Sequence, residues 1–222
     1  RCLPREQSDE ESAQLLTEIV PVIMERNGFE EIYSANWWYK LKHGCAAYGV
    51  FWDSAAQNGL GDVLVTRIDL LNIFWEPGVT DIQKSRNIFI VDLVPTEDLR
   101  ARYPSAKITG GSGASAELET YRFDDAVRVD DKTLVVDWYY KKTDKSGRTV
   151  LHYCKFAENE VLFASENEKE YESRGWYDDG MYPIDFDVLY PEEGTPIGFG
   201  IVSVCKDAQL SIDELDGAIL KT

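Results

Sequence analysis

Acid–base or metal chemistry in this chain would have to come from adjacent carboxylates and two histidines. Two carboxylates facing each other across a cleft can hydrolyse a glycosidic bond or hold a hard cation. Neighbouring residues on a strand point to opposite faces, so we interpret the aspartate pairs as solvated acidic turns. No His-Glu-x-x-His or Gly-x-Ser-x-Gly motif accompanies the histidines, and each is interpreted as a surface or structural residue. The residues concerned are Asp124-Asp125, Asp130-Asp131, Asp178-Asp179, His43 and His152.

Aromatic pairs and a glycine-rich stretch could bind a ligand without catalysis. Trp37-Trp38 and Tyr139-Tyr140 could form a stacking platform for sugars or bases, although aromatics on strands more often belong to a core. The stretch Gly110–Ala116 could cradle a phosphate, but no Gly-Lys-Ser/Thr follows it. We interpret this stretch as a flexible connector and expect it to be mobile.

The cysteines show no pattern of a metal site. None of the four has metal-ligand spacing or a Cys-x-x-Cys motif, so we interpret them as free thiols in a reducing compartment. Together these features predict no catalytic, metal-binding or cofactor-binding residue, and no hydrolase or transferase activity. The cysteines are Cys2, Cys45, Cys154 and Cys205.

Length and charge narrow the class of protein. The chain has 222 residues, 44% of them hydrophobic, which is enough for a globular core without disulfides. No apolar run approaches the roughly 20 residues of a membrane-spanning helix. The chain has 23 basic and 40 acidic residues, a net charge of −17, which argues against tight phosphate binding. The charge is still compatible with a surface that DNA passes without sticking to it. It begins at Arg1 and stops at Thr222 inside an expected helix, so we expect a piece of a longer polypeptide.

Two helices are expected at the start of the chain. Ser8 and Glu11 fit a capping box that would begin the first helix. Pro21 is expected to kink or interrupt it, and Gly28 is a second expected break. The second helix is expected from Phe29 to Leu41.

The residue pattern changes from helix to strand at Gly44. Asn58-Gly59 lies in an expected hairpin loop, and Thr96 is expected to cap a short helix over Glu97 to Tyr103. A further loop is expected from Ser105 to Leu118, and the second half reads as an antiparallel meander. The expected extended segments are 45–52, 62–68, 87–94, 133–142, 148–156, 161–165 and 183–190.

A final helix carries one apolar stripe, with Lys206, Asp213 and Asp216 on its opposite face. We predict an α+β fold with N-terminal helices, a mostly antiparallel β-sheet domain and a C-terminal helix. The expected organisation is a helical segment 1–43, a β-rich domain 44–200 with a flexible loop near 105–118, and a helix start at 201–222. The stripe is a candidate packing or interface surface, which we expect to rest on the chain's own β domain. It consists of Ile201, Val204, Ala208, Ile212, Leu215 and Ile219.

Short motifs occur in a definite order in two parts of the chain. They are Val50-Phe51-Trp52-Asp53, Gly61-Asp62-Val63, Asp69 to Gly78, the set Glu97, Leu99, Tyr103 and Pro104, then Met181 to Phe186, Gly194 to Gly200 and Asp207 to Asp213. In this order they resemble the wing region of portal proteins, the head-tail connectors of tailed bacteriophages. Ile73-Phe74 departs from the family, whose members carry charged or proline-rich versions there, and 105–128 shows no resemblance.

The resemblance implies a structural protein of the virion with no cofactor and no membrane. Portal proteins form rings at one capsid vertex, commonly of twelve subunits joined head to tail around a channel for double-stranded DNA. Membership would imply a homo-oligomeric ring of twelve subunits that binds terminase, capsid and head-completion proteins. The ring would assemble in the host bacterial cytoplasm. We expect the fragment alone to be mainly monomeric or weakly associated and the full-length protein to form the ring.

Two other classes of function stay open on the residues alone. The aromatics and carboxylates would also suit a carbohydrate-binding or hydrolysing β domain. A β domain that binds a partner peptide along a strand edge is the third hypothesis.

Overall fold

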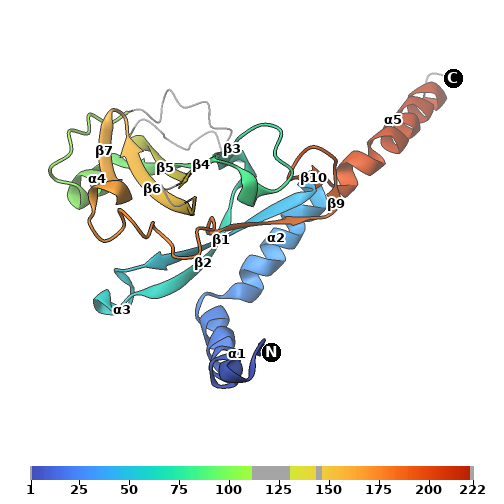
Figure 1. Cartoon of the computed structure of the whole chain (residues 1–222). Helices are drawn as coiled ribbons and strands as arrows, with labels where there is room; N and C mark the ends of the chain where they lie inside the picture. The colour runs from blue at the N-terminus through green and yellow to red at the C-terminus, as the bar shows by residue number, and fades with distance from the viewer. Residues whose placement is uncertain (1, 112–130, 144–146, 221–222) are drawn as a thin grey trace. The chain divides into compact units, whose positions relative to one another are not determined.

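The computed structural model describes residues 2–111, 131–143 and 147–220 (Figure 1). The chain divides into two compact units. The first unit comprises Arg1–Ile68, Pro183–Glu192 and Ile197–Thr222, and the second comprises Asp69–Tyr182 and Glu193–Pro196. The predicted α+β class is confirmed. Along the chain, two helices come first, the strands of antiparallel sheets follow, and a helix comes last.

The first unit begins with two consecutive helices, α1 (Glu10–Arg26) and α2 (Phe29–His43). Gly28 separates them with a φ of +61°, a left-handed conformation that favours glycine, so the predicted break is confirmed. Pro21 lies inside α1 and does not interrupt it, which corrects the expected interruption. A proline costs a helix one backbone hydrogen bond, and the turns on both sides of Pro21 continue without it.

The predicted capping box at the start of α1 is wrong. Ser8 lies in a short 3-10 helix, η1 (Gln7–Asp9), and its hydroxyl bonds Asp9 Oδ1. The residue before α1 is Asp9, whose side chain makes no capping hydrogen bond. The helix therefore starts one residue later than a cap at Ser8 requires.

A three-stranded antiparallel sheet completes the first unit's core, in the order β2-β1-β8. The β1–β2 hairpin was predicted, with a loop that contains the short helix α3 (Ala56–Gly59). The pairing of β1 with β8 was not predicted, because β8 follows far later in the chain. The strands are β1 (Cys45–Asp53), β2 (Asp62–Ile68) and β8 (Ile184–Val188).

The last helix, α5 (Ile201–Ile219), begins where α2 ends. Added side-chain carbons would collide at this junction: a Cβ on Gly200 would lie 2.4 Å from the Lys42 carbonyl oxygen, and one on Gly44 would lie 2.2 Å from the Phe199 carbonyl carbon. The two glycines therefore allow the end of α2 and the start of α5 to approach. Two short strands, β9 (Tyr190–Pro191) and β10 (Gly198–Phe199), pair just before α5.

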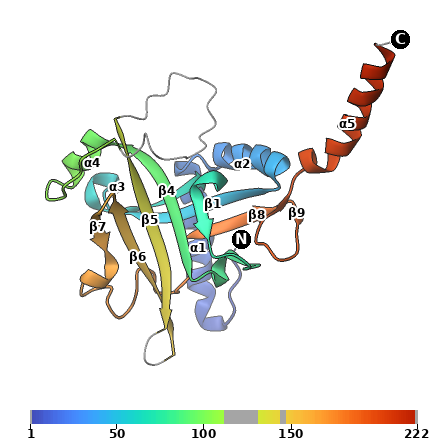
Figure 2. The same ribbon diagram turned by 90° about the horizontal axis from the view of Figure 1, so that it is seen from above.

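The second unit is a five-stranded antiparallel sheet in the order β3-β4-β5-β6-β7 (Figure 2). The meander predicted for the second half of the chain is confirmed for β5, β6 and β7, whereas their pairing with β4 was not predicted. One helix, α4 (Thr96–Arg102), follows β4. The strands are β3 (Ile73–Trp75), β4 (Asn87–Pro95), β5 (Lys132–Thr143), β6 (Thr149–Ala157) and β7 (Glu160–Ala164). Short 3-10 helices lie at η2 (Leu70–Asn72), η3 (Ile82–Lys84) and η5 (Ser165–Asn167).

The core of the second unit lies under α4, where Leu99, Ile108, Val135 and Ala157 form one buried cluster. Thr96 does not cap α4 as predicted. It is the first residue of the helix, and its hydroxyl bonds the Thr133 hydroxyl at 2.8 Å instead. The predicted mobile stretch Gly110–Ala116 lies mostly outside the described residues, which end at Gly111 before this gap.

Candidate functional site

The first unit contains an apolar groove of about 560 Å³ between its N-terminal helices and one face of its sheet. Strand alternation explains the face, because Val50 pairs with Val65 and Tyr48 with Asp185, which directs these side chains to the same side. The lining residues are Val20, Ile23, Met24, Phe29, Tyr33, Tyr48, Val50, Val63, Val65, Asp185, Phe186 and Asp187. No local sequence pattern indicates this groove, since its lining comes from five separate elements.

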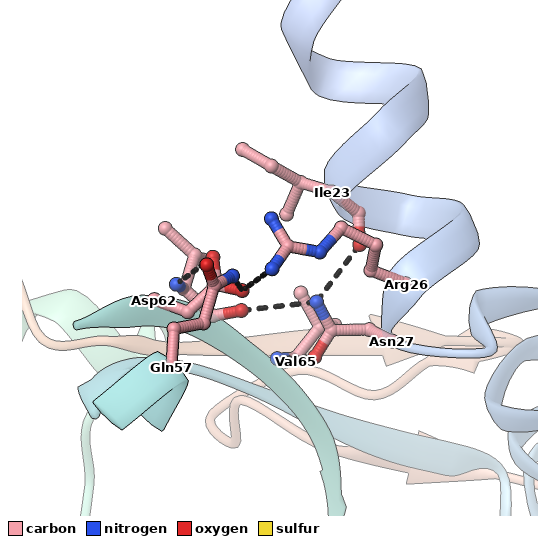
Figure 3. A network of polar contacts seen from close by, with 7 residues as sticks. Ile23, Arg26, Asn27, Gln57, Asp62 and Val65 are labelled. Carbon is pink, nitrogen blue, oxygen red and sulfur yellow. Dashed lines mark hydrogen bonds and ion pairs between the residues drawn. The ribbon is translucent and has the colours of Figure 1, made fainter. Parts of the chain in front are cut away.

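A polar clasp holds the end of α1 against strand β2, next to residues that line the groove (Figure 3). The Asn27 amide nitrogen donates to the Val63 carbonyl oxygen at 2.9 Å, and the Asn27 amide oxygen accepts from the Val65 N–H at 2.9 Å. Because β2 is at the edge of its sheet, Asn27 takes the place of a neighbouring strand for these backbone groups. The clasp thereby fixes where α1 ends.

Charged groups reinforce this clasp beside Asn27. Arg26 Nη2 lies 2.8 Å from Asp62 Oδ2, and Gln57 Nε2 donates to the same carboxylate oxygen at 2.7 Å. The Asn27 amide nitrogen also donates to the Ile23 carbonyl oxygen at 2.8 Å, inside α1. A helix end, a hairpin loop and a strand are joined by these bonds (Figure 3).

Two aspartates are the charged residues of the groove lining. Asp187 Oδ1 lies 2.5 Å from Lys40 Nζ, whose side chain is largely buried, whereas Asp185 is exposed. Burial, followed by the nearby Asp187 carboxylate, raises the pKa of the Cys45 thiol to about 12. Cys45 is therefore an inert thiol at neutral pH.

The aromatic residues singled out in the sequence do not form a platform. Tyr139 and Tyr140 are buried on opposite faces of the five-stranded sheet. Trp37 and Trp38 are exposed on α2, where Lys42 Nζ lies 4.4 Å from the centre of a Trp38 ring. The exposed tryptophans of α2 are therefore covered in part by lysine ammonium groups.

The six residues of the predicted stripe lie on one side of α5 and are all exposed. No residue of α5 that the structure describes is buried, and Leu215 keeps 65% of its surface accessible. The expectation that the stripe rests on the chain's own β domain is therefore wrong. The cause is the junction at Gly200: α5 meets α2 at its first turn and then extends away from the β2-β1-β8 sheet (Figures 1 and 2).

The aspartates of the acidic pairs that the structure describes make local contacts with nearby residues or the backbone. Asp178 Oδ1 lies 3.3 Å from Arg174 Nε, and Asp179 Oδ1 accepts from the Met181 N–H at 3.0 Å. The Asp131 carbonyl oxygen accepts from the Thr96 N–H. Asp124, Asp125 and Asp130 lie outside the described residues.

One arrangement that the sequence analysis missed resembles a nucleophile with its base. His152 Nδ1 lies 3.2 Å from Ser165 Oγ, and His152 Nε2 lies 3.7 Å from Glu166 Oε1. Ser165 is 0% exposed, and its oxygen also accepts from the Tyr153 N–H at 3.0 Å. A substrate cannot reach this hydroxyl, so the cluster is a buried structural network.

The part of the chain that the structure describes offers neither a metal site nor a membrane-spanning helix. Within 2–111, 131–143 and 147–220 the structure holds no group of three or more His, Cys, Asp or Glu side chains that could bind a metal ion. All four cysteines are free thiols. Among these residues no helix has the length and apolar character needed to cross a membrane. His43 stacks on Tyr39, with ring centres 5.8 Å apart.

Comparison with known protein families matches most of the chain to one family model. The family model described as phage P22-like portal protein matches residues 1–181 of the 222-residue chain. Among curated proteins no sequence matches the chain. The matched residues include α1, α2, the β1–β2 hairpin and the whole five-stranded sheet.

Proposed function

The chain belongs to the phage P22-like portal protein family, and from this premise we propose that its full-length protein forms the ring through which DNA enters and leaves the capsid. The family gives the coarse role, a structural head-tail connector of the phage that takes part in DNA packaging. The proposal adds a closed, homo-oligomeric ring of twelve copies at one capsid vertex, joined head to tail around the channel.

The observation that carries this proposal is the exposed apolar stripe of α5. A soluble monomer rarely leaves a long apolar helix face in water, because burying such a surface releases about 25 cal/mol per Å². The stripe residues Ile201, Val204, Ile212, Leu215 and Ile219 are all large and exposed. A surface of this kind is expected in a subunit that is completed by its neighbours.

The charge of the chain supports the proposed channel. A net charge of −17 makes the average surface repel phosphate, so duplex DNA can move past it without being held. We infer passage of double-stranded DNA without sequence specificity. No enzymatic activity is part of the proposal, since the family is structural and the motor that drives DNA belongs to the terminase.

The further partners follow from the same role. We propose that the ring contacts terminase during packaging, the capsid at its vertex and head-completion proteins afterwards. The protein would assemble in the host bacterial cytoplasm and remain in the virion.

Sedimentation velocity of the 222-residue chain and of the full-length portal protein tests this proposal. We expect the chain to be mainly monomeric or weakly associated at micromolar concentration, because repulsion among subunits of charge −17 opposes assembly at low salt. The full-length protein should sediment as one large closed species. A full-length protein that stays monomeric at all concentrations would overturn the proposal.

A further inference from the structure

The apolar groove and the apolar stripe lie at opposite ends of helix α2. Phe29 and Tyr33, in the first turns of α2, line the groove. The stripe begins beyond the last turn of α2, where Gly200 meets the Lys42 carbonyl. Helix α2 has 15 residues, and therefore a length of about 22 Å. Since α5 extends away from α2 after this junction (Figure 1), the α5 of a chain does not reach the groove of the same chain.

The two surfaces suit each other chemically. Ten of the twelve groove-lining residues are uncharged, and the two charged ones are aspartates. Successive residues of a helix are 100° apart, so the stripe in the first half of α5 is bordered by Cys205 and Ser211, which are also uncharged. Asp185 is exposed at the groove and has no ion pair with any residue that the structure describes, so it would repel a carboxylate-bearing surface. The stripe is the surface of α5 that avoids this repulsion.

We propose that α5 of one copy lies in the groove of the next copy, with its apolar stripe facing α1, α2 and the β2-β1-β8 sheet. Recognition of an amphipathic helix by an apolar groove is a recurrent mode of association. Because helix and groove are different surfaces, the contact is head to tail, and repetition by a rotation that closes gives a ring. The inference deepens the proposed function and rests on it for the identity of the partner, a second copy of this chain.

The contact is expected to be weak between two isolated chains. One helix in one groove buries less than the roughly 1,200 Å² of a stable interface. In a closed ring each subunit makes the contact twice, once with its helix and once with its groove, so that the ring is far more stable than the pair. Weak association of the isolated chain and a stable ring are thus compatible.

Two matched pairs of charge substitutions in the 222-residue chain test the contact. On α5, Ile212→Glu alters the stripe, while Leu210→Glu alters a residue of equal exposure, 51% in each case, that lies two residues and therefore 200° away. On α1, Val20→Glu alters the groove and Val22→Glu alters an exposed valine outside it. Equilibrium sedimentation from micromolar to near-millimolar concentration should show at least about tenfold weaker association for Ile212→Glu and Val20→Glu, and an unchanged constant for both controls. Circular dichroism and thermal melting verify that each variant is folded.

Mixing the two defective variants identifies the surfaces that meet. Val20→Glu retains an intact helix and Ile212→Glu retains an intact groove, so the mixture should form a 1:1 pair that neither variant forms alone, and no larger species. If helices paired with helices, or grooves with grooves, the mixture would show no new pair. That outcome, or equal weakening by the controls Leu210→Glu and Val22→Glu, would overturn the inference.

The same variants separate this inference from the proposed ring. If full-length Val20→Glu and Ile212→Glu proteins still form rings as stable as the unaltered one, the helix–groove contact is wrong while the ring stands. If the unaltered full-length protein forms no ring but the 1:1 pair appears on mixing, the contact stands and the proposed function fails.

Discussion

Arg26, the last residue of α1, forms an ion pair of 2.8 Å with Asp62, the first residue of strand β2. The next residue, Asn27, makes two hydrogen bonds to the backbone of that strand. The end of α1 is thus joined to the sheet by an exposed ion pair and by an amide that completes the edge of β2. Losing the ion pair and losing the amide hydrogen bonds should lower the free energy of unfolding by different amounts.

Replacing Asn27 should destabilise the chain more than replacing Arg26. Asn27→Ala leaves the Val65 N–H and the Val63 carbonyl without their partner, at a cost of about 1–3 kcal/mol. Arg26→Ala removes a half-exposed ion pair, which contributes at most about 1 kcal/mol. Urea denaturation of both variants measures the difference, and an Arg26→Ala loss larger than that of Asn27→Ala would contradict this account of the clasp.

Two glycines of the C-terminal region should respond oppositely to alanine. Gly200→Ala places a Cβ 2.4 Å from the Lys42 carbonyl oxygen, so the junction of α2 and α5 must open and the melting temperature should fall. Gly217 lies within α5 with no atom within 4 Å of an added Cβ, and Gly217→Ala should stabilise the helix by about 0.5–1 kcal/mol. Thermal melting followed by circular dichroism compares the two, and a Gly200→Ala protein as stable as Gly217→Ala would disprove the close junction.

His152 should make the folded chain less stable as the pH falls below 6.5, the usual pKa of a histidine. Burial lowers the pKa of His152 below the usual value of 6.5, an effect that Glu166 partly offsets. Below pH 6.5 the unfolded chain therefore binds more protons at this residue than the folded chain, and the free energy of unfolding decreases. The loss attributable to His152 begins near pH 6.5 and grows as the pH decreases.

His152→Gln removes this titration. Denaturation from pH 7.5 to pH 5 should give a flatter stability profile for His152→Gln than for the unaltered chain. A His152 pKa above 6.5 in an NMR titration would contradict the burial argument.

Local signals in the sequence predicted most elements. Gly28 and Gly44 bound helix α2, and both have the left-handed φ that makes a glycine a reliable boundary. The long strands β5 and β6 were predicted from their runs of apolar and aromatic residues. Ser8 and Thr96 show the limit of such signals, because a hydroxyl can bond Asp9 or Thr133 as readily as a helix terminus.

Contacts between distant segments could not be predicted in the same way. The pairing of β1 with β8 depends on residues far apart in the chain, and no local pattern specifies it. The apolar stripe lies on one helix, so the periodicity of α5 alone was enough to identify it. The groove is built from α1, α2 and three strands, so no single segment of the sequence indicated it. Periodicity also does not state what covers a stripe, so its exposure appeared only in the structure.

The chain should not bind duplex DNA tightly. Its charge of −17 leaves no excess of lysine and arginine to release counterions from phosphates. Fluorescence anisotropy of a labelled duplex should therefore show no saturable binding by this chain at physiological salt. Submicromolar binding with a steep dependence on salt would contradict the proposed passive channel wall.

Electron microscopy of the full-length portal protein tests the ring most directly. The account predicts closed rings of twelve subunits, joined head to tail around a central channel, with α5 of each subunit against the N-terminal helices of its neighbour. Monomers, or dimers related by a two-fold axis that buries the same surface on both subunits, would contradict it.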